Sequence, residues 1–212
     1  MGIVQGLTEF LPISSAGHLI LVPWLFGWDD RFVTSLAFSV MLHLGTLGAL
    51  LLYFARDWIR LVGAGVGSLR ERRIGDDPTR RLAWVLVVAT VPAALAGALL
   101  GDAVEANTRR PAIVAAGRLL GLEREAAARF SFLLATPTIA GAGLFELYRL
   151  ARGESSVSPD LAVLVVGIVA SAVTGVLAIH GLLGWFKRRG VGIFVLYRVA
   201  LAAAIVILLL QV

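Results

Sequence analysis

The sequence predicts an all-α integral membrane protein, a polytopic bundle of transmembrane helices that forms a single domain over residues 1–212. Of the 212 residues, 58% are hydrophobic and 16% are charged, whereas a soluble domain has about 25% charged residues. The mean hydropathy is +0.88. A soluble fold with this composition would lack the polar side chains needed to cover its core, and lipid as the outer solvent removes that requirement.

Long apolar runs recur along the chain and predict the individual helices. A hydrocarbon core of about 30 Å requires roughly 20 apolar residues in helical form. The runs that reach or approach this length, the third being the shortest, cover residues 36–54, 82–100, 130–145, 161–185 and 191–212. Pro92 lies inside the second run and predicts a kink there.

Residues 10–28 form a different kind of apolar segment, because prolines, serines, a glycine and a histidine interrupt it. A helix facing lipid would not have this composition. Backbone that lines a protein-walled cavity tolerates such breaks. We therefore expect a broken or re-entrant helical hairpin near the N-terminus.

The loops between these runs predict an orientation. Residues 55–81 contain seven arginines against four acidic residues, and residues 187–189 are Lys-Arg-Arg. Both segments should be cytoplasmic under the positive-inside rule. The balanced residues 101–110 should then face outward. This rule also explains the net charge of +5 better than nucleic-acid binding does.

The expected alternation of cytoplasmic and outward-facing loops breaks down near residue 111. Residues 118–129, which alternate arginine and glutamate, should be cytoplasmic when counted back from residues 187–189. Residues 111–117 are far too few to cross the bilayer from an outer loop. Either this segment is partly interfacial, or a stretch of chain is missing here.

Other features of the composition exclude certain kinds of site and favour a membrane protein. The chain has no cysteine, which excludes disulfides and thiolate metal sites. The 23 glycines suit close helix packing in a membrane. The N-terminus lacks a basic region, and Glu9 would lie within its apolar stretch, so we do not expect a cleaved signal peptide.

A polar cluster in apolar sequence is the strongest functional signal, and it consists of Gln5, Glu9, Ser14, Ser15 and His18. Gln5 and Glu9 are four residues apart and share one face of a helix. Pro12 ends or bends that helix, and the two serines then predict a new helix N-terminus, whose N–H groups favour an anion. A carboxylate, two hydroxyls and an imidazole at such a place could bind a phosphate with its metal ion and supply a base or nucleophile.

Each polar residue also has a structural explanation. Serines in membrane helices often bond to their own backbone. Glu9 is harder to explain in this way, because intramembrane acids are costly and usually functional. Outside the cluster, His43 is a candidate packing or supporting residue, and we expect His180 to have only a structural role. Arg198 either snorkels or pairs with an inward acid.

Three stretches resemble one family. The segment GIVQGLTEFLPISSAGHLIL (residues 2–21) is similar to the N-terminal signature of the undecaprenyl-pyrophosphate phosphatases, bacterial membrane enzymes associated with bacitracin resistance. Residues 124–143 (REAAARFSFLLATPTIAGAG) and 194–203 (FVLYRVALAA) also resemble this family. The similarity extends along nearly the whole chain.

The resemblance implies an enzyme that hydrolyses undecaprenyl pyrophosphate to undecaprenyl phosphate and inorganic phosphate, which recycles the lipid carrier of cell-wall synthesis. It implies two inverted repeats, each with a re-entrant hairpin. It assigns Gln5 and Glu9 to a divalent metal, Mg²⁺ or Ca²⁺, and to the diphosphate. Ser15 becomes the candidate nucleophile or phosphate ligand, Ser14 a phosphate ligand and His18 the candidate base.

The chain also departs from the family. The second family motif, Pro-Gly-x-Ser-Arg-Ser, is absent, and we therefore expect the second hairpin to be deleted near residues 111–117. Its arginine would stabilise developing charge on the phosphate, and Arg118 and Arg198 are weak substitutes. A deletion variant, a damaged gene product and a mis-assembled sequence remain open, each with impaired activity.

The expected location is the bacterial inner membrane, with the site facing the extracytoplasmic side. The expected partners are a polyprenyl pyrophosphate and membrane lipids, without nucleic acid, and a homodimer is left open. Two alternatives remain. Broken helices at mid-membrane are also a transporter design, so the chain could move the lipid carrier as a flippase, or it could be an inactive scaffold.

Overall fold

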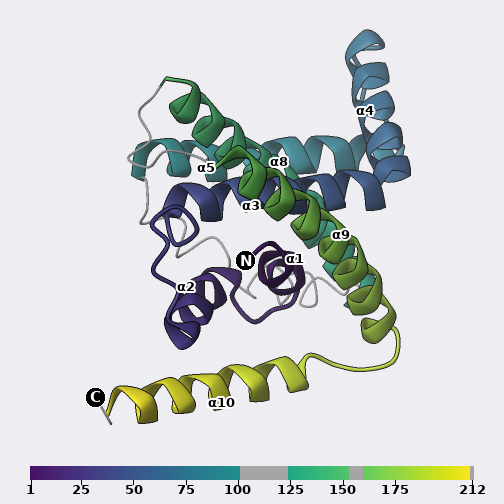
Figure 1. Cartoon of the computed structure of the whole chain (residues 1–212). Coiled ribbons are helices and arrows are strands. Elements are labelled where there is room, and N and C mark those ends of the chain that lie inside the picture. The colour runs from purple at the N-terminus through teal and green to yellow at the C-terminus, as the bar shows by residue number, and fades with distance from the viewer. Residues whose placement is uncertain (101–123, 153–159, 211–212) are drawn as a thin grey trace.

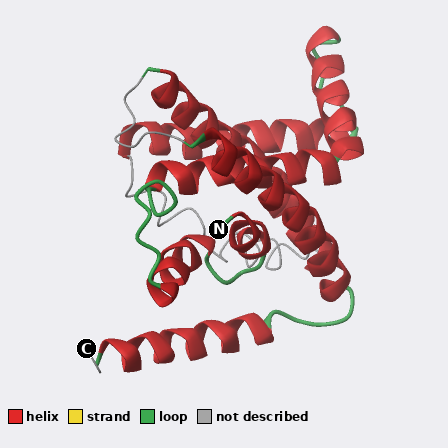
Figure 2. Cartoon of the chain, in the orientation of Figure 1, coloured by secondary structure: helices red, strands yellow, loops and turns green. Residues whose placement is uncertain are grey.

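The computed structural model describes residues 1–100, 124–152 and 160–210, and the regular structure in these ranges is entirely helical (Figure 2). This confirms the predicted all-α class. The described helices, labelled in Figure 1, are α1 (Gly2–Phe10), α2 (Ser15–Phe26), α3 (Leu36–Tyr53), α4 (Ala55–Arg70), α5 (Pro78–Leu100), α8 (Arg124–Ala151), α9 (Leu161–Phe186) and α10 (Gly192–Leu209).

Three of the described helices, α3, α8 and α9, are long and apolar enough to cross a bilayer. They coincide with the first, third and fourth predicted runs. The run at residues 82–100 lies within α5, and α10 covers most of the last run. The protein is therefore a polytopic helical membrane protein.

Two boundaries differ from the sequence prediction. Residues 55–81 were expected to be a loop, but 16 of them form α4. The helix is amphipathic, and its Ser68 Oγ accepts a hydrogen bond of 2.8 Å from Trp84 Nε1 on α5. Residues 124–129, expected as part of a separate charged segment, form the first turns of the 28-residue α8.

Glycines let α1 and α9 approach each other closely. A Cβ atom on Gly2 would lie 2.2 Å from the carbonyl oxygen of Gly167, and one on Gly6 would lie 2.5 Å from that of Ser171. Further along, Phe10 contacts Gly175. Small residues at such crossings permit backbone contact in membranes. The register shows that α1 and α9 run in the same direction.

Helix α3 shares this direction. Leu42 lies against Gly167, and Ala49 lies against Gly175. The hydroxyl of Ser171 donates a hydrogen bond of 3.0 Å to the Leu42 carbonyl and joins the two helices at this crossing. Helices α1, α3 and α9 thus form the centre of the fold.

Helices α1 and α2 form the predicted hairpin. Leu19 of α2 packs in a cluster with Phe38 and Leu164, and Val4 covers the same cluster. These residues lie near the beginnings of α1, α3 and α9, so α2 returns to the side from which α1 entered. Phe10, just before the hairpin tip, lies beside the middle of α9. The hairpin therefore enters and leaves the bundle on one side.

Helices α5 and α8 run in the same direction although they are consecutive among the described elements. Thr79 at the start of α5 and Ala126 at the start of α8 line the same cavity. Because α5 has 23 residues, its far end lies about 35 Å away at 1.5 Å per residue. The predicted deletion at 111–117 and the substitute Arg118 lie outside the described residues.

Helix α10 lies apart from the central helices, along the lower edge of Figure 1. Near its start, the ring of Phe194 packs edge-on against Trp185 and Phe186 at the end of α9. Most of its other side chains are exposed. Its position brings Tyr197 to the α1–α2 hairpin.

Candidate active site

The site begins with one carboxylate on α1. Gln5 and Glu9 share a helix face as predicted, and Gln5 Nε2 donates a hydrogen bond of 2.9 Å to Glu9 Oε2. Gln5 is fully buried, and the Glu9 side chain is 9% exposed. A carboxylate at this depth requires polar partners, and the neighbouring elements supply them.

The second element of the site is the turn between α1 and α2. The hydroxyl of Ser15 donates a hydrogen bond of 2.5 Å to the same Glu9 oxygen, and Ser15 is buried. Ser14 is the N-cap of α2, with φ 72° and ψ 95°, a left-handed conformation that is uncommon outside glycine. Its hydroxyl accepts the Gly17 N–H at 3.4 Å. The sequence correctly predicted this helix break and cap.

His43, on α3, is also part of the site. Its Nδ1–H donates to the Ser39 carbonyl at 2.8 Å, which leaves Nε2 facing Glu9 Oε2 at 3.4 Å. Three groups from three helices thus converge on one carboxylate oxygen: an amide, a hydroxyl and an imidazole. The sequence placed His43 in mid-span but did not connect it with Glu9.

His18 has different partners. Its Nδ1–H donates to the Ser14 carbonyl at 2.7 Å, so Nε2 is the acceptor for the Tyr197 hydroxyl, also at 2.7 Å. The two rings are nearly parallel, 12° apart, with centroids separated by 5.8 Å. The Ser15 hydroxyl donates to Glu9, whereas both ring nitrogens of His18 bond to the Ser14 carbonyl and the Tyr197 hydroxyl.

Sequence reasoning missed Tyr197. The residue lies in an apolar run with no local polar pattern around it except Arg198, and only the position of α10 brings it to His18. Arg198 itself is exposed and forms no ion pair with any acidic residue of the described segments. His180 lies away from the site and contacts the Tyr53 hydroxyl at 3.4 Å.

The arrangement fits a divalent metal in part. Gln5 Oε1 is buried and has no hydrogen-bond partner among the described residues, so the amide group that donates to Glu9 also carries one hard oxygen ligand. The described residues contain no cluster of three histidine, cysteine or acidic side chains able to enclose an ion. This suits Mg²⁺, which usually takes one or two protein carboxylates and completes its shell with substrate phosphates and water.

The site can therefore perform a specific kind of chemistry. The α2 N-terminus offers backbone N–H groups and a positive dipole end to a phosphate. A serine hydroxyl beside it is already hydrogen bonded to a carboxylate, which is the pairing that activates a hydroxyl nucleophile. These groups favour reactions at the phosphorus of an anionic ester or anhydride.

Comparisons with known proteins give concordant results. The family model of the bacitracin resistance protein BacA matches residues 1–117 and 108–204. The undecaprenyl-diphosphatase of Desulforudis audaxviator is 40% identical over 99% of this chain and 96% of the relative. That of Pelotomaculum thermopropionicum is 36% identical over 98% and 94%. The first alignment spans 264 positions, more than the 212 residues of this chain.

Proposed function

Because the chain belongs to the bacitracin resistance protein BacA family, we propose that it is an undecaprenyl-diphosphatase, which hydrolyses undecaprenyl pyrophosphate to undecaprenyl phosphate and inorganic phosphate. Such a hydrolase recycles the lipid carrier of cell-wall synthesis and is linked to bacitracin resistance. The names of the similar proteins favour hydrolysis over the transporter and scaffold alternatives.

One observation supports the proposed chemistry most directly, the hydrogen bond of 2.5 Å from Ser15 Oγ to Glu9 Oε2. In the proposed first step, Ser15 Oγ attacks the terminal phosphorus while its proton passes to Glu9. The bond from that phosphorus to the bridging oxygen breaks, the proton passes from Glu9 to the departing phosphate oxygen, and undecaprenyl phosphate leaves. Water then attacks the phosphoserine while the carboxylate of Glu9 takes a proton from it, and Glu9 returns this proton to Ser15 Oγ as inorganic phosphate is released.

The neighbouring residues have supporting roles in this proposal. The Gln5 amide donates to Glu9 Oε2 and keeps it directed at Ser15, and the His43 imidazole lies against the same oxygen. Ser14 and the α2 N-terminus bind the phosphate oxygens, and His18 lies one turn further along. Gln5 Oε1 and Glu9 would hold the divalent ion, which when bound neutralises negative charge on the diphosphate.

We place the protein in the bacterial inner membrane with the site open to the extracytoplasmic side. The basic residues 55–81 follow α3, and Lys187 at the end of α9 pairs with Glu125 at the start of α8 at 3.6 Å. Both basic segments thus lie at one end of the bundle, which the positive-inside rule assigns to the cytoplasm. The hairpin opens toward the other end.

We also propose that a segment is missing between α5 and α8. The family model matches in two pieces that meet at residues 108–117, and the alignment with the first relative exceeds the chain by more than 50 positions. In addition, α5 and α8 run in the same direction, and two consecutive spans of one direction require a third crossing between them. The second family motif would lie in such a segment, so this chain should be a weak enzyme.

Phosphate release from undecaprenyl pyrophosphate by the purified protein tests the proposal. We expect Glu9→Gln and Ser15→Ala to lower the rate by about 100-fold or more, while exposed Glu71→Gln leaves it unchanged. Release by the wild type that does not exceed that of Glu9→Gln would contradict hydrolysis by this chain. Carrier movement across liposomes without hydrolysis would support the transporter alternative.

The missing segment has its own test. Insertion of the Desulforudis audaxviator segment that has no counterpart here should raise the rate by about 100- to 1,000-fold, the usual contribution of one electrostatic group at a transition state. An insertion variant that folds and gains no activity would show that the segment is not what limits this chain.

A further inference from the structure

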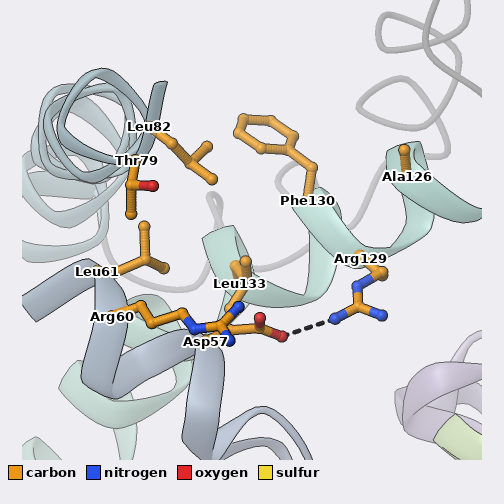
Figure 3. A pocket seen from close by; sticks show the side chains of 9 residues that line it. All are labelled: Asp57, Arg60, Leu61, Thr79, Leu82, Ala126, Arg129, Phe130 and Leu133. Atoms are coloured by element: carbon orange, nitrogen blue, oxygen red, sulfur yellow. Dashed lines mark hydrogen bonds and ion pairs between the residues drawn. The ribbon is translucent and has the colours of Figure 1, made fainter. Parts of the chain in front are cut away.

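A cavity lies where α4, α5 and α8 meet, and no residue of the hairpin lines it (Figure 3). It has a volume of about 410 Å³ and is lined by Asp57, Arg60, Leu61, Thr79, Leu82, Ala126, Arg129, Phe130 and Leu133. Its size falls within the usual range for small-molecule sites, about 300–1,000 Å³. None of Gln5, Glu9, Ser15 and His43 lines it, so the cavity is separate from the candidate active site.

The cavity has an excess of positive charge. Arg129 Nη2 pairs with Asp57 Oδ2 at 2.7 Å, and the Arg129 guanidinium also stacks over the Phe54 ring at 5.5 Å. Arg60 reaches the cavity from the other side of Asp57 in Figure 3. It forms no ion pair with an acid in the described part of the chain. The cavity thus carries two arginines and one acid, and this excess of positive charge suits an anionic ligand.

The remaining walls are apolar. Leu61, Leu82, Phe130 and Leu133 come from three helices and give one side of the cavity a hydrocarbon surface. A small free anion would leave this surface exposed to water. A ligand with a charged end and an apolar end would use both sides of the cavity.

The position of the cavity in the bundle indicates where such a ligand comes from. Figure 1 shows α4 standing across α3 and α5, as an amphipathic helix does when it lies along a membrane surface. Pairing of Lys187 with Glu125 places the second basic segment at this same end. Basic pockets between helices at the cytoplasmic surface bind the head groups of anionic lipids.

We propose that this cavity binds the phosphate head group of an anionic membrane phospholipid, with Arg60 as the main phosphate ligand and the apolar wall against the upper acyl chains. The Thr79 hydroxyl is a second hydrogen-bond donor on the cavity lining. The ion pair between Asp57 and Arg129 joins α4 to α8 on the cavity lining. This proposal is independent of the hydrolase activity, because no residue of the hairpin takes part.

Thermal unfolding in nanodiscs tests the proposal. Phosphatidylglycerol should raise the Tm of the wild type above its value in phosphatidylcholine. Native mass spectrometry should show retained phosphatidylglycerol, whose affinity falls about tenfold in Arg60→Gln, the effect of losing one charge-assisted hydrogen bond. The matched control is Arg56→Gln, which removes an exposed arginine one turn away that does not line the cavity.

Two results would overturn the proposal. Equal losses of phosphatidylglycerol binding in Arg60→Gln and Arg56→Gln would show only general attraction of basic residues to an anionic surface. Stabilisation by inorganic phosphate in phosphatidylcholine nanodiscs, lost in Arg60→Gln to the same extent, would identify a site for a free anion instead of a lipid. Circular dichroism of both variants shows whether they remain folded.

Discussion

The hydroxyl of Tyr197 donates a hydrogen bond of 2.7 Å to Nε2 of His18, across 179 positions of sequence. Because the Ser14 carbonyl accepts from Nδ1 at 2.7 Å, the histidine is held at both nitrogens. This pair is the polar link between α10 and the hairpin, and it ties the last helix to the phosphate-binding turn.

The first prediction concerns this link. Tyr197→Phe keeps the stacked ring but removes the donor to His18, so we expect kcat to fall by about three- to tenfold, the effect of one neutral hydrogen bond. The Tm should change little because Tyr197 is partly exposed. Steady-state phosphate release measures kcat, and Tyr148→Phe, an exposed tyrosine on α8, is the control. Equal kcat values for the two variants would contradict a role for the link.

The second prediction concerns the divalent ion. Removal of metal with a chelator should abolish phosphate release, and addition of Mg²⁺ should restore it. Gln5→Ala removes the unpaired Oε1 and should raise the Mg²⁺ concentration for half-maximal activity by about tenfold or more, as loss of one oxygen ligand does. Activity that persists unchanged in the chelator would exclude a metal at Gln5 and Glu9.

The third prediction concerns packing of the hairpin on α9. In Gly6→Ala, the new Cβ would lie 1.9 Å from Thr174 Oγ1 and 2.5 Å from the Ser171 carbonyl oxygen. The backbone must move, so we expect destabilisation by about 1–3 kcal/mol and a lower Tm. Gly48→Ala has no atom within 4 Å of its new Cβ and serves as the control. A Tm for Gly6→Ala equal to that of the control would show that α1 does not pack on α9 as described.

The fourth prediction is a pH dependence at the membrane surface. Arg80 donates to both oxygens of Glu71, at 2.6 and 2.8 Å, and these hydrogen bonds lower the pKa of Glu71 from 4.5. The pair therefore contributes stability above pH 4.5, and this contribution disappears as the pH falls through the lowered pKa. The effect is small because the pair is exposed.

The measurement for this pair is the Tm difference between wild type and Glu71→Gln. It should be constant near neutral pH and vanish well below pH 4.5. Asp29→Asn, which changes an exposed acid that forms no ion pair within the described residues, shows any general effect of charge removal. A difference that grows with acidification would contradict the assignment.

Much of the fold and part of the site could be predicted from sequence, because the signals are local. Apolar runs of membrane length define α3 and α9, and the i, i+4 spacing of Gln5 and Glu9 places both on one face. The serine cap of α2 follows from the residues next to Pro12. These features depend on neighbours within about ten positions.

The rest depends on packing between distant segments. His43 reaches Glu9 because α3 crosses α1, and Tyr197 reaches His18 because α10 returns beside the hairpin. The spacing of residues within one apolar helix does not predict which side chain of another helix it will contact. Helix α4 was missed for another reason, since its arginines resemble a charged loop until Leu61 on its apolar face is placed in one buried cluster with Leu86 of α5.

The one-sided hairpin has a pharmacological consequence. Glu9 and Ser15 lie at the tip of a segment that enters and leaves the bundle on the same side. A compound that blocks them needs access to only one aqueous compartment. In the proposed orientation that compartment is outside the cytoplasm, so a polar inhibitor that cannot cross the inner membrane would still reach its target, and efflux pumps that empty the cytoplasm would offer no protection.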